Sequence, residues 1–182
     1  MLIERFMNIT PRLVLDATAF IAGLSPSSLD VETYTTPSVI EELRGRYSHL
    51  RYSIASQTEK LKILHPSQTS LAAVEKASLT LGDKWKLSEA DLSILALALE
   101  LKAQGGEVAI VSDDYSIQNV AGYLDITHNS ISATGIRSRI RWALRCTSCR
   151  KVLPSNFTGR VCPVCGGEVR RKAISKTSTI HR

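Results

Sequence analysis

The chain has 182 residues, of which 43% are hydrophobic and 5% aromatic, a length that fits one medium domain plus a small additional module. The first apolar stretch is interrupted by Asp16 and lacks the pattern of a secretory signal, and the run from Leu92 to Leu101 is too short for a bilayer, which needs about 20 residues. We therefore expect a soluble, cytoplasmic protein without a membrane partner.

The net charge of +6 is distributed unevenly along the chain. Residues 137–182 contain 12 Lys or Arg and one acid, Glu168, whereas residues 1–136 contain 11 Lys or Arg and 16 acids. This asymmetry predicts a basic segment that binds a polyanion and an acidic body with a different task. A solvated basic tail without a partner is the alternative.

The first 128 residues alternate short apolar runs with helical patterns. Strands are expected at residues 13–16, 34–36, 60–64 and 108–111, and helices at residues 17–23, 37–47, 67–81, 89–104 and 114–121. The apolar strands have no polar face. The pattern therefore predicts an α/β fold with a mainly parallel sheet that is flanked by helices.

Periodicity is lost after Leu124, which places a domain boundary nearby. We divide the chain into an α/β domain at 1–128, a basic connector at 129–144, a cysteine module at 145–174 and a flexible tail at 175–182. In the connector, arginines alternate with Ser138, Ile140 and Trp142, a pattern that leaves both a strand and a helical connector open.

All four cysteines belong to two C-x2-C pairs, Cys146 with Cys149 and Cys162 with Cys165. Two such pairs close a tetrahedral thiolate site, which is the geometry that Zn²⁺ prefers. About 30 residues cannot build a self-sufficient core, so the metal supplies folding energy to a small β zinc ribbon. Four protein ligands leave no open position, which makes this single Zn²⁺ structural. Disulfides, free thiols and an iron centre are the alternatives.

Basic side chains surround the cysteine module. A small rigid scaffold can present such side chains to the phosphates of RNA. The predicted RNA-binding residues are Arg139, Arg141, Arg145, Arg150, Lys151, Arg160, Arg170, Arg171 and Lys172.

Acidic residues occupy the positions where a parallel sheet gathers chemistry, namely the ends of strands and the starts of helices. Asp16 ends the first strand, Glu42 lies early in its helix, Asp91 begins the longest helix, and the pair Asp113 and Asp114 follows the last apolar strand. Taken singly, the later acids are explained as helix caps or exposed side chains. Asp16 is different, because a carboxylate at the end of an apolar strand needs a partner.

Together, these carboxylates predict a cation site. Converging negative charges repel one another, and a hard divalent cation such as Mg²⁺ or Mn²⁺ relieves the repulsion. One or two such ions polarise a phosphodiester and lower the pKa of water. No cysteine remains outside the zinc module to act as a nucleophile, and no glycine-rich phosphate loop predicts a nucleotide cofactor.

Four segments resemble the acidic motifs of PIN-domain nucleases. They are Leu13-Val-Leu-Asp16-Ala-Thr-Ala-Phe20, Thr36-Pro37-Ser-Val-Ile-Glu-Glu42-Leu43, Ser88-Glu-Ala-Asp91-Leu-Ser-Ile-Leu-Ala96-Leu-Ala98 and Val111-Ser-Asp-Asp114-Tyr-Ser-Ile-Gln118-Asn119-Val-Ala121. Followed by Arg141-Trp-Ala-Leu-Arg145-Cys146-Thr-Ser-Cys149 and the second cysteine pair, they resemble the Nin-one-binding protein family, in a compact archaeal form. These PIN and zinc-ribbon endonucleases form the 3′ end of small-subunit ribosomal RNA. The resemblance extends from about Leu13 to Ala173.

The resemblance implies a metal-dependent endoribonuclease that hydrolyses a phosphodiester bond in precursor ribosomal RNA of the small subunit, leaving 3′-hydroxyl and 5′-phosphate ends. It implies Asp16, Glu42, Asp91 and Asp114 as Mg²⁺ or Mn²⁺ ligands, with Asp113 as the other candidate of its pair. Ser112 stands where many relatives carry Thr, and it preserves the hydroxyl. A toxin-type PIN ribonuclease acting on tRNA or mRNA is one alternative. A non-catalytic RNA-binding assembly factor is the other.

Overall fold

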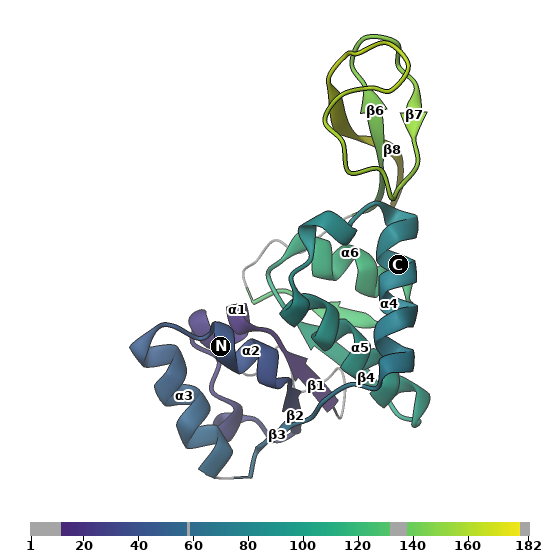
Figure 1. Cartoon of the computed structure of the whole chain (residues 1–182). Helices are drawn as coiled ribbons and strands as arrows, with labels where there is room; N and C mark the ends of the chain where they lie inside the picture. Colours follow the sequence, from purple (N-terminus) through teal and green to yellow (C-terminus); the bar gives the residue numbers. More distant parts are fainter. Residues whose placement is uncertain (1–11, 58, 132–137, 179–182) are drawn as a thin grey trace.

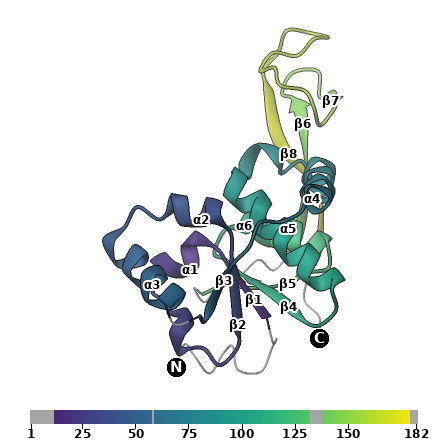
Figure 2. The same ribbon diagram turned by 60° about the horizontal axis from the view of Figure 1, so that its bottom comes forward.

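The computed structural model describes residues 12–57, 59–131 and 138–178, which form two units (Figure 1). The larger unit packs helices around a parallel sheet. The smaller unit is an antiparallel sheet that projects from one end of the larger unit, as both ribbon views show (Figures 1 and 2). The first unit, within residues 12–131, contains the four segments that resemble PIN-domain nucleases and is therefore called the nuclease domain below. The second unit, residues 138–178, is called the ribbon.

The sheet of the nuclease domain has five strands in the order β3-β2-β1-β4-β5, and every neighbouring pair is parallel. This arrangement confirms the predicted α/β fold with a mainly parallel sheet. The strands are β1 (Arg12–Leu15), β2 (Glu32–Thr35), β3 (Leu61–Ile63), β4 (Val108–Val111) and β5 (Thr127–Asn129).

The helices lie in two groups, one on each side of the sheet. The chain first runs from the central strand β1 outward to β3, and then it crosses to β4 and continues outward to β5. Helices α1 to α3 accompany the first half and helices α4 to α6 the second (Figures 1 and 2). The helices are α1 (Ala17–Ile21), α2 (Pro37–Glu42), α3 (Arg46–Gln57), α4 (Gln68–Leu81), α5 (Glu89–Ala103) and α6 (Tyr115–Tyr123), with 3₁₀ turns η2 (Pro26–Ser28) and η3 (Lys84–Lys86).

The site is positioned where the strand order reverses, between the parallel strands β1 and β4. This place is called the reversal point of the sheet below. In open α/β sheets, ligands bind outside the carboxyl ends of the strands where the strand order reverses. Strands β1 and β4 are buried along almost their whole length, and α5 is buried on most of its surface because it packs against α4, α2 and β4. The carboxyl ends of β1 and β4 therefore lie side by side on a rigid base.

The predicted helix from Pro37 through Tyr47 is wrong. Helix α2 ends at Glu42, where Leu43 adopts an extended backbone conformation and buries its side chain in the core. The chain then begins α3 at Arg46, which leaves Tyr47 75% exposed. Neither α3 nor β5 was expected, because α3 buries only Ser48 and Ala55 and β5 has three residues.

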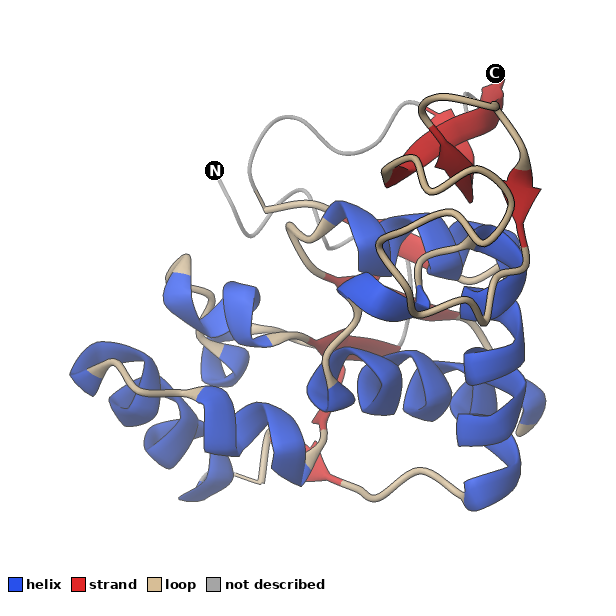
Figure 3. Cartoon of the chain, turned by 45° about the horizontal axis from the view of Figure 1, so that its top comes forward, coloured by secondary structure: helices blue, strands red, loops and turns tan. Residues whose placement is uncertain are grey.

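The ribbon contains β6 (Ser138–Cys146), β7 (Val152–Leu153) and β8 (Val169–Ser178) in the order β7-β6-β8. Strand β6 decides the open question about the connector, because antiparallel pairing with β8 runs from Ser138 to Cys146. The paired region includes residues that the sequence analysis assigned to the connector and the tail. Figure 3 shows strands and loops in this unit, in contrast to the helix-rich nuclease domain.

None of the helices in the described ranges has the length and apolar character that crossing a membrane requires.

Candidate active site

Asp16 is the buried carboxylate at the centre of the candidate active site. It follows β1 directly, caps the N-terminus of α1 and is only 3% exposed. Its Oδ1 accepts a hydrogen bond from the Ala17 N–H (2.5 Å), and its Oδ2 accepts from the hydroxyls of Thr18 (2.7 Å) and Ser112 (2.8 Å). These donors hold the carboxylate in one orientation and compensate for its burial.

Ser112 joins Asp16 to the end of β4. Its buried hydroxyl donates to Asp16 and accepts from the Asp114 N–H (3.0 Å), while its carbonyl oxygen accepts from the Gln118 side chain (2.7 Å). Because the hydroxyl acts as donor and acceptor at once, it fixes the ends of β1 and β4 relative to each other.

The two aspartates after Ser112 have different surroundings. The Asp113 carboxylate accepts hydrogen bonds from the Ser130 hydroxyl and the Ile131 N–H, so it is bound to the segment that follows β5. The Asp114 carboxylate caps α6 by accepting from the Ser116 N–H (2.5 Å). Its negative charge acts on Asp91. Asp114 is therefore electrostatically coupled to another predicted site residue.

Asp91 has a double role. It forms a capping box with Ser88, in which its carboxylate accepts from the Ser88 N–H (2.7 Å) and its own N–H donates to the Ser88 hydroxyl (3.2 Å). Burial raises the pKa of Asp91 to about 6, and the negative charges of Asp16 and Asp114 contribute to the rise. Asp91 is thus a helix cap, as its sequence position alone suggested. It is also repelled by the carboxylates of Asp16 and Asp114.

Glu42 lies apart from these three. It is the exposed last residue of α2 and lines an open cavity of about 430 Å³ together with Glu41, Arg44 and Glu89. The cavity lies where α2 meets the start of α5. Glu42 therefore approaches the start of α5, the helix that carries Asp91, from the other half of the fold.

The three coupled carboxylates fit a divalent cation by their charge. In the part of the chain that the structure describes, only the four cysteines have ligand atoms all within 4.8 Å of one another, so the carboxylates are spaced more widely than that. Excess negative charge is nevertheless concentrated at the reversal point of the sheet, and the carboxylates repel one another there. A hard cation with oxygen ligands relieves such repulsion.

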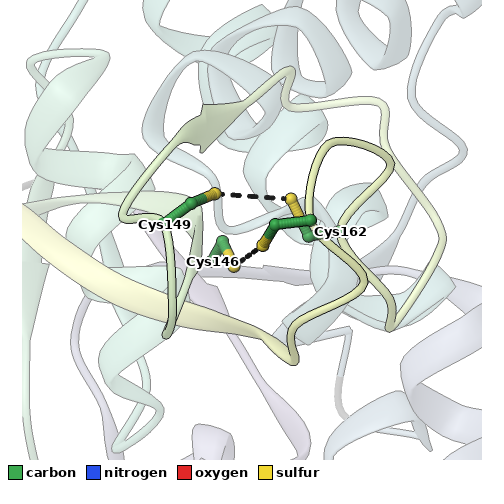
Figure 4. A group of neighbouring side chains, drawn as sticks. Cys146, Cys149 and Cys162 are labelled. Carbon is green, nitrogen blue, oxygen red and sulfur yellow. Dashed lines mark hydrogen bonds between the residues drawn. The ribbon is translucent and has the colours of Figure 1, made fainter.

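The cysteines form a compact thiolate cluster in the ribbon (Figure 4). The sulfur atoms of Cys146 and Cys165 are 3.5 Å apart, and those of Cys149 and Cys162 are 3.7 Å apart. A tetrahedron with Zn–S bonds of about 2.3 Å has edges of about 3.8 Å, whereas a disulfide requires about 2.05 Å. The cluster is therefore compatible with a structural zinc and not with two disulfides.

Tight turns of the backbone support this cluster. Hydrogen bonding from the Val164 N–H lowers the pKa of Cys162, which favours the thiolate that a metal requires. At Gly167, a Cβ would collide with the Ser148 side chain and would lie 3.0 Å from the Cys146 Sγ. Gly167, which follows the second cysteine pair, thus allows the two C-x2-C turns to approach each other closely.

Most of the predicted RNA-binding side chains are exposed on the ribbon. This group comprises Arg141, Arg145, Arg150, Lys151, Arg160, Arg170 and Lys172. Arg170 forms an exposed ion pair with Glu168 (2.9 Å). The side chain of Arg139 lies outside the described residues.

Arg171 differs from the other basic residues because it connects the ribbon to the nuclease domain. Its guanidinium pairs with the buried carboxylate of Asp83, donates to the Gly82 carbonyl oxygen (3.0 Å) and lies 4.3 Å from the centre of the Trp142 ring. Asn119 completes the junction, since its side chain donates to Asp83 and exchanges two hydrogen bonds with the Ile140 backbone (2.7 Å each). The charge of Arg171 is thus engaged within the protein.

Sequence analysis did not anticipate Asp83 or Asn119. Asp83 follows Gly82, which ends α4 in a left-handed conformation, so it looks like an ordinary loop residue. Asn119 lies on the buried face of α6, where a polar residue needs a partner. A polar residue on a largely apolar helix face was therefore the available signal in the sequence. Its partners, Asp83 and Ile140, are too far away in sequence to be identified from it.

The buried Asp16, the coupled Asp91 and Asp114, and a parallel sheet with this strand order define a PIN-domain endoribonuclease. The family model described as PIN domain of ribonuclease matches residues 13–101.

Curated relatives extend the similarity through the ribbon. Endoribonuclease Nob1 of Pyrococcus abyssi is 40% identical over 159 residues, which cover 87% of this chain and 92% of the relative. Ribonuclease VapC1 of Thermoplasma acidophilum is 36% identical over 93% of this chain and 82% of the relative. The 20S-pre-rRNA D-site endonuclease NOB1 of Saccharomyces cerevisiae is 31% identical over 68% of this chain and 26% of the relative. The chain belongs to the Nob1 endoribonuclease family.

Proposed function

We propose that this endoribonuclease cleaves precursor ribosomal RNA of the small subunit and thereby forms its mature 3′ end, with 3′-hydroxyl and 5′-phosphate products. Support comes from the relatives, since the yeast protein is named as an endonuclease of 20S pre-rRNA and the archaeal one covers nearly the whole chain. The exposed basic side chains of the ribbon suit contact with the phosphates of ribosomal RNA. The precursor ribosomal particle in the cytoplasm is the proposed setting.

The proposed catalytic residues are Asp16, Asp91 and Asp114, with Glu42 at the edge of the site. The observation that carries this proposal is the coupling of Asp91 to both Asp16 and Asp114 at the reversal point of the sheet. These carboxylates would hold one or two Mg²⁺ or Mn²⁺ ions, which supply charge stabilisation for an in-line displacement at phosphorus. Asp113 would shape the neighbouring loop. The four cysteines would hold one structural Zn²⁺.

The protein's own residues keep the site ready for RNA. Thr18 and Ser112 fix the Asp16 carboxylate, so it does not have to reorganise when substrate arrives. Helices α5 and α6 begin at the site, where the Ser88 N–H bonded to Asp91 and the Ser116 N–H bonded to Asp114 hold these carboxylates in fixed orientations. Preorganised negative charge is what a cation-assisted hydrolase needs.

Carboxylate substitutions test this function. Purified Asp16→Asn and Asp91→Asn should lose cleavage of a precursor-rRNA oligonucleotide with Mn²⁺ by at least about 100-fold, while circular dichroism shows retained folding. Asp30→Asn is the matched control, because exposed Asp30 precedes β2 and so lies toward the opposite edge of the sheet. Equal cutting by wild type and Asp16→Asn would remove these carboxylates from the mechanism.

A toxin-type ribonuclease that cuts tRNA or mRNA is the second candidate, because the relative in Thermoplasma acidophilum is named Ribonuclease VapC1. A substrate panel separates the two functions. The ribosomal proposal predicts one mapped end on precursor rRNA and little cutting of tRNA or mRNA. The reverse pattern would favour the second candidate, whereas binding of RNA without any cleavage would indicate a non-catalytic assembly factor.

A further inference from the structure

A pocket of about 350 Å³ lies at the junction, the place where the ribbon meets the nuclease domain, and is called the junction pocket below. Residues of α4 and η3 line one side, and residues of β6, β7 and β8 line the other. Among them are Leu79, Trp85, Arg141, Trp142, Val152 and Ile174. The volume falls at the lower end of the range for small-molecule sites, about 300–1,000 Å³. The pocket is therefore large enough for one planar ring system, and both units are needed to form it.

The walls of the pocket are apolar and aromatic. Trp85 is 56% exposed, although Trp is a residue that proteins normally bury to a large extent. Its indole N–H donates to the Ser155 carbonyl oxygen of the ribbon at 3.4 Å, which orients the ring across the junction. Val152 and Ile174 are also exposed. A flat apolar ligand would cover these surfaces and stack on the indole ring.

The charge around the pocket is positive. Arg141 belongs to its lining, and exposed Lys86 follows Trp85 in η3. Arg171 also lines the pocket, but its charge is compensated by Asp83. No Asp or Glu lines the part that the structure describes. Apolar walls with a cationic edge match a nucleotide, which combines an aromatic base with an anionic phosphate. A base stacked on an aromatic side chain and a backbone phosphate beside Arg or Lys are the standard contacts to single-stranded RNA.

The segment that lines one side of the pocket leads directly to the candidate active site. Trp85 precedes by three residues Ser88, which forms the capping box with Asp91. Asp83, at the start of the same segment, is close enough to Asp114 for the charge of Asp114 to affect it. A nucleotide held at Trp85 would therefore place the next part of the strand near the carboxylates.

We propose that the junction pocket binds one unpaired nucleotide of the RNA substrate, with its base stacked on Trp85 and its phosphate beside Arg141. The proposal deepens the function above and depends on it in one respect, namely that the substrate is RNA. The pocket would then act as a positioning site that sets which phosphodiester reaches the carboxylates.

Binding measured without divalent cations tests the pocket separately from cleavage. The probes are single-stranded oligoadenylate, the same strand paired with oligouridylate, and inorganic polyphosphate as an anion without bases. Trp85→Ala should weaken oligoadenylate binding about 5- to 100-fold, as expected for loss of one stacked base. Binding of polyphosphate should stay unchanged. Trp85→Phe should retain most of the affinity, because the aromatic face remains.

Tyr47→Ala is the matched control, since it removes an exposed aromatic ring on α3, away from the junction. Circular dichroism and thermal unfolding verify that each variant is folded. Equal oligoadenylate affinity of wild type and Trp85→Ala would overturn the pocket proposal. So would a loss of polyphosphate affinity in Trp85→Ala as large as the loss of oligoadenylate affinity. The proposal also expects wild type to bind the single strand more tightly than the duplex, and equal affinity for the two would overturn it. Because cleavage is assayed separately, such a failure leaves the proposed nuclease function testable, and an inactive wild type would not disturb the binding result.

Discussion

The hydroxyl of Ser112 shows how much of the site depends on one small side chain. It is the shared hydrogen-bonding partner of Asp16 and of the Asp114 backbone, and it is fully buried. A hydroxyl at this position can satisfy both partners without adding charge. Thr would preserve this hydroxyl.

Ser112→Ala should therefore damage both stability and activity. It leaves a buried carboxylate oxygen with one donor fewer and the Asp114 N–H without its acceptor, at a cost of about 1–3 kcal/mol. We expect a lower Tm and at least about ten-fold slower cleavage. Ser112→Thr is the matched control and should retain both. A variant Ser112→Ala with unchanged Tm and rate would show that the hydroxyl does not organise the site.

Asp91 gives the site a dependence on pH. Its pKa of about 6 in the folded protein lies above the ordinary value of 3.8, because burial and neighbouring charges disfavour the anion. The folded protein thus binds this proton more tightly than the unfolded chain. The resulting contribution to stability is complete below pH 3.8 and is lost as the pH rises through about 6.

Asp91→Asn should consequently raise the stability of the cation-free protein at pH 8. We expect a gain of about 1 kcal/mol after allowance for solvent screening, and this gain should vanish near pH 4. Added Mn²⁺ should raise the Tm of wild type and have a smaller effect on the variant. Thermal unfolding across pH, with and without Mn²⁺, measures both effects. If Asn lowered stability at pH 8, the capping role of Asp91 would outweigh the repulsion.

Among single residues, those with a local signal were predictable from sequence. Asp16 was identified because a carboxylate ending an apolar strand needs partners, and the structure supplies three donors. For Asp113 and Asp114, the sequence could not separate the two roles, because these depend on which side chain contacts the segment after β5. The same limit applies to Arg171, which looked like any other basic residue of the ribbon.

At the scale of elements, periodicity predicted the buried strands and long helices but not the elements that depend on distant partners. Strands β1 and β4 and helices α4 and α5 have strong apolar patterns, and they were found. Strand β6 could not be told from a helix, because its partner β8 begins more than 20 residues after β6 ends. Helix α3 was missed since its buried residues are few.

The zinc ribbon should be the element most sensitive to metal removal. Its described buried apolar residues are few compared with those of the nuclease domain, so a Zn²⁺ bound by the four cysteines would contribute much of its folding energy. Chelation at neutral pH, or Cys149→Ser, should abolish amide protection in β7 and in the turns around the cysteines. Hydrogen exchange should show retained protection in α5 and β4. Loss of protection in both units at once would mean that they fold as one cooperative unit.

At the scale of the whole molecule, the orientation of the ribbon depends on a polar junction. The ion pair between Arg171 and Asp83 is largely buried, and Asn119 ties the same carboxylate to the β6 backbone. Gly82 permits the close approach, because a Cβ at this residue would lie 2.5 Å from the Trp142 carbonyl oxygen. The family resemblance predicted the two units, but it contained no information about the angle between them.

Arg171→Gln should therefore loosen the junction. It leaves the Asp83 carboxylate buried without its charged partner, which should cost about 2–3 kcal/mol and increase hydrogen exchange in β6 near Ile140. Arg170→Gln is the matched control, because Arg170 is exposed and solvent screens its ion pair with Glu168, so its loss should hardly change stability. Equal effects of the two substitutions on Tm and exchange would show that the junction is not stabilised by this pair.

Strand β6 passes without a loop from Trp142, at the nuclease domain, to Cys146, at the thiolate cluster. Over these four steps the strand advances about 13 Å, and the antiparallel pairing with β8 stiffens it. RNA phosphates bound by the basic side chains of the ribbon would thereby be held at a set distance from the proposed cleavage site. Selection of the cut would then depend on distance along the folded RNA more than on the identity of the bases beside it.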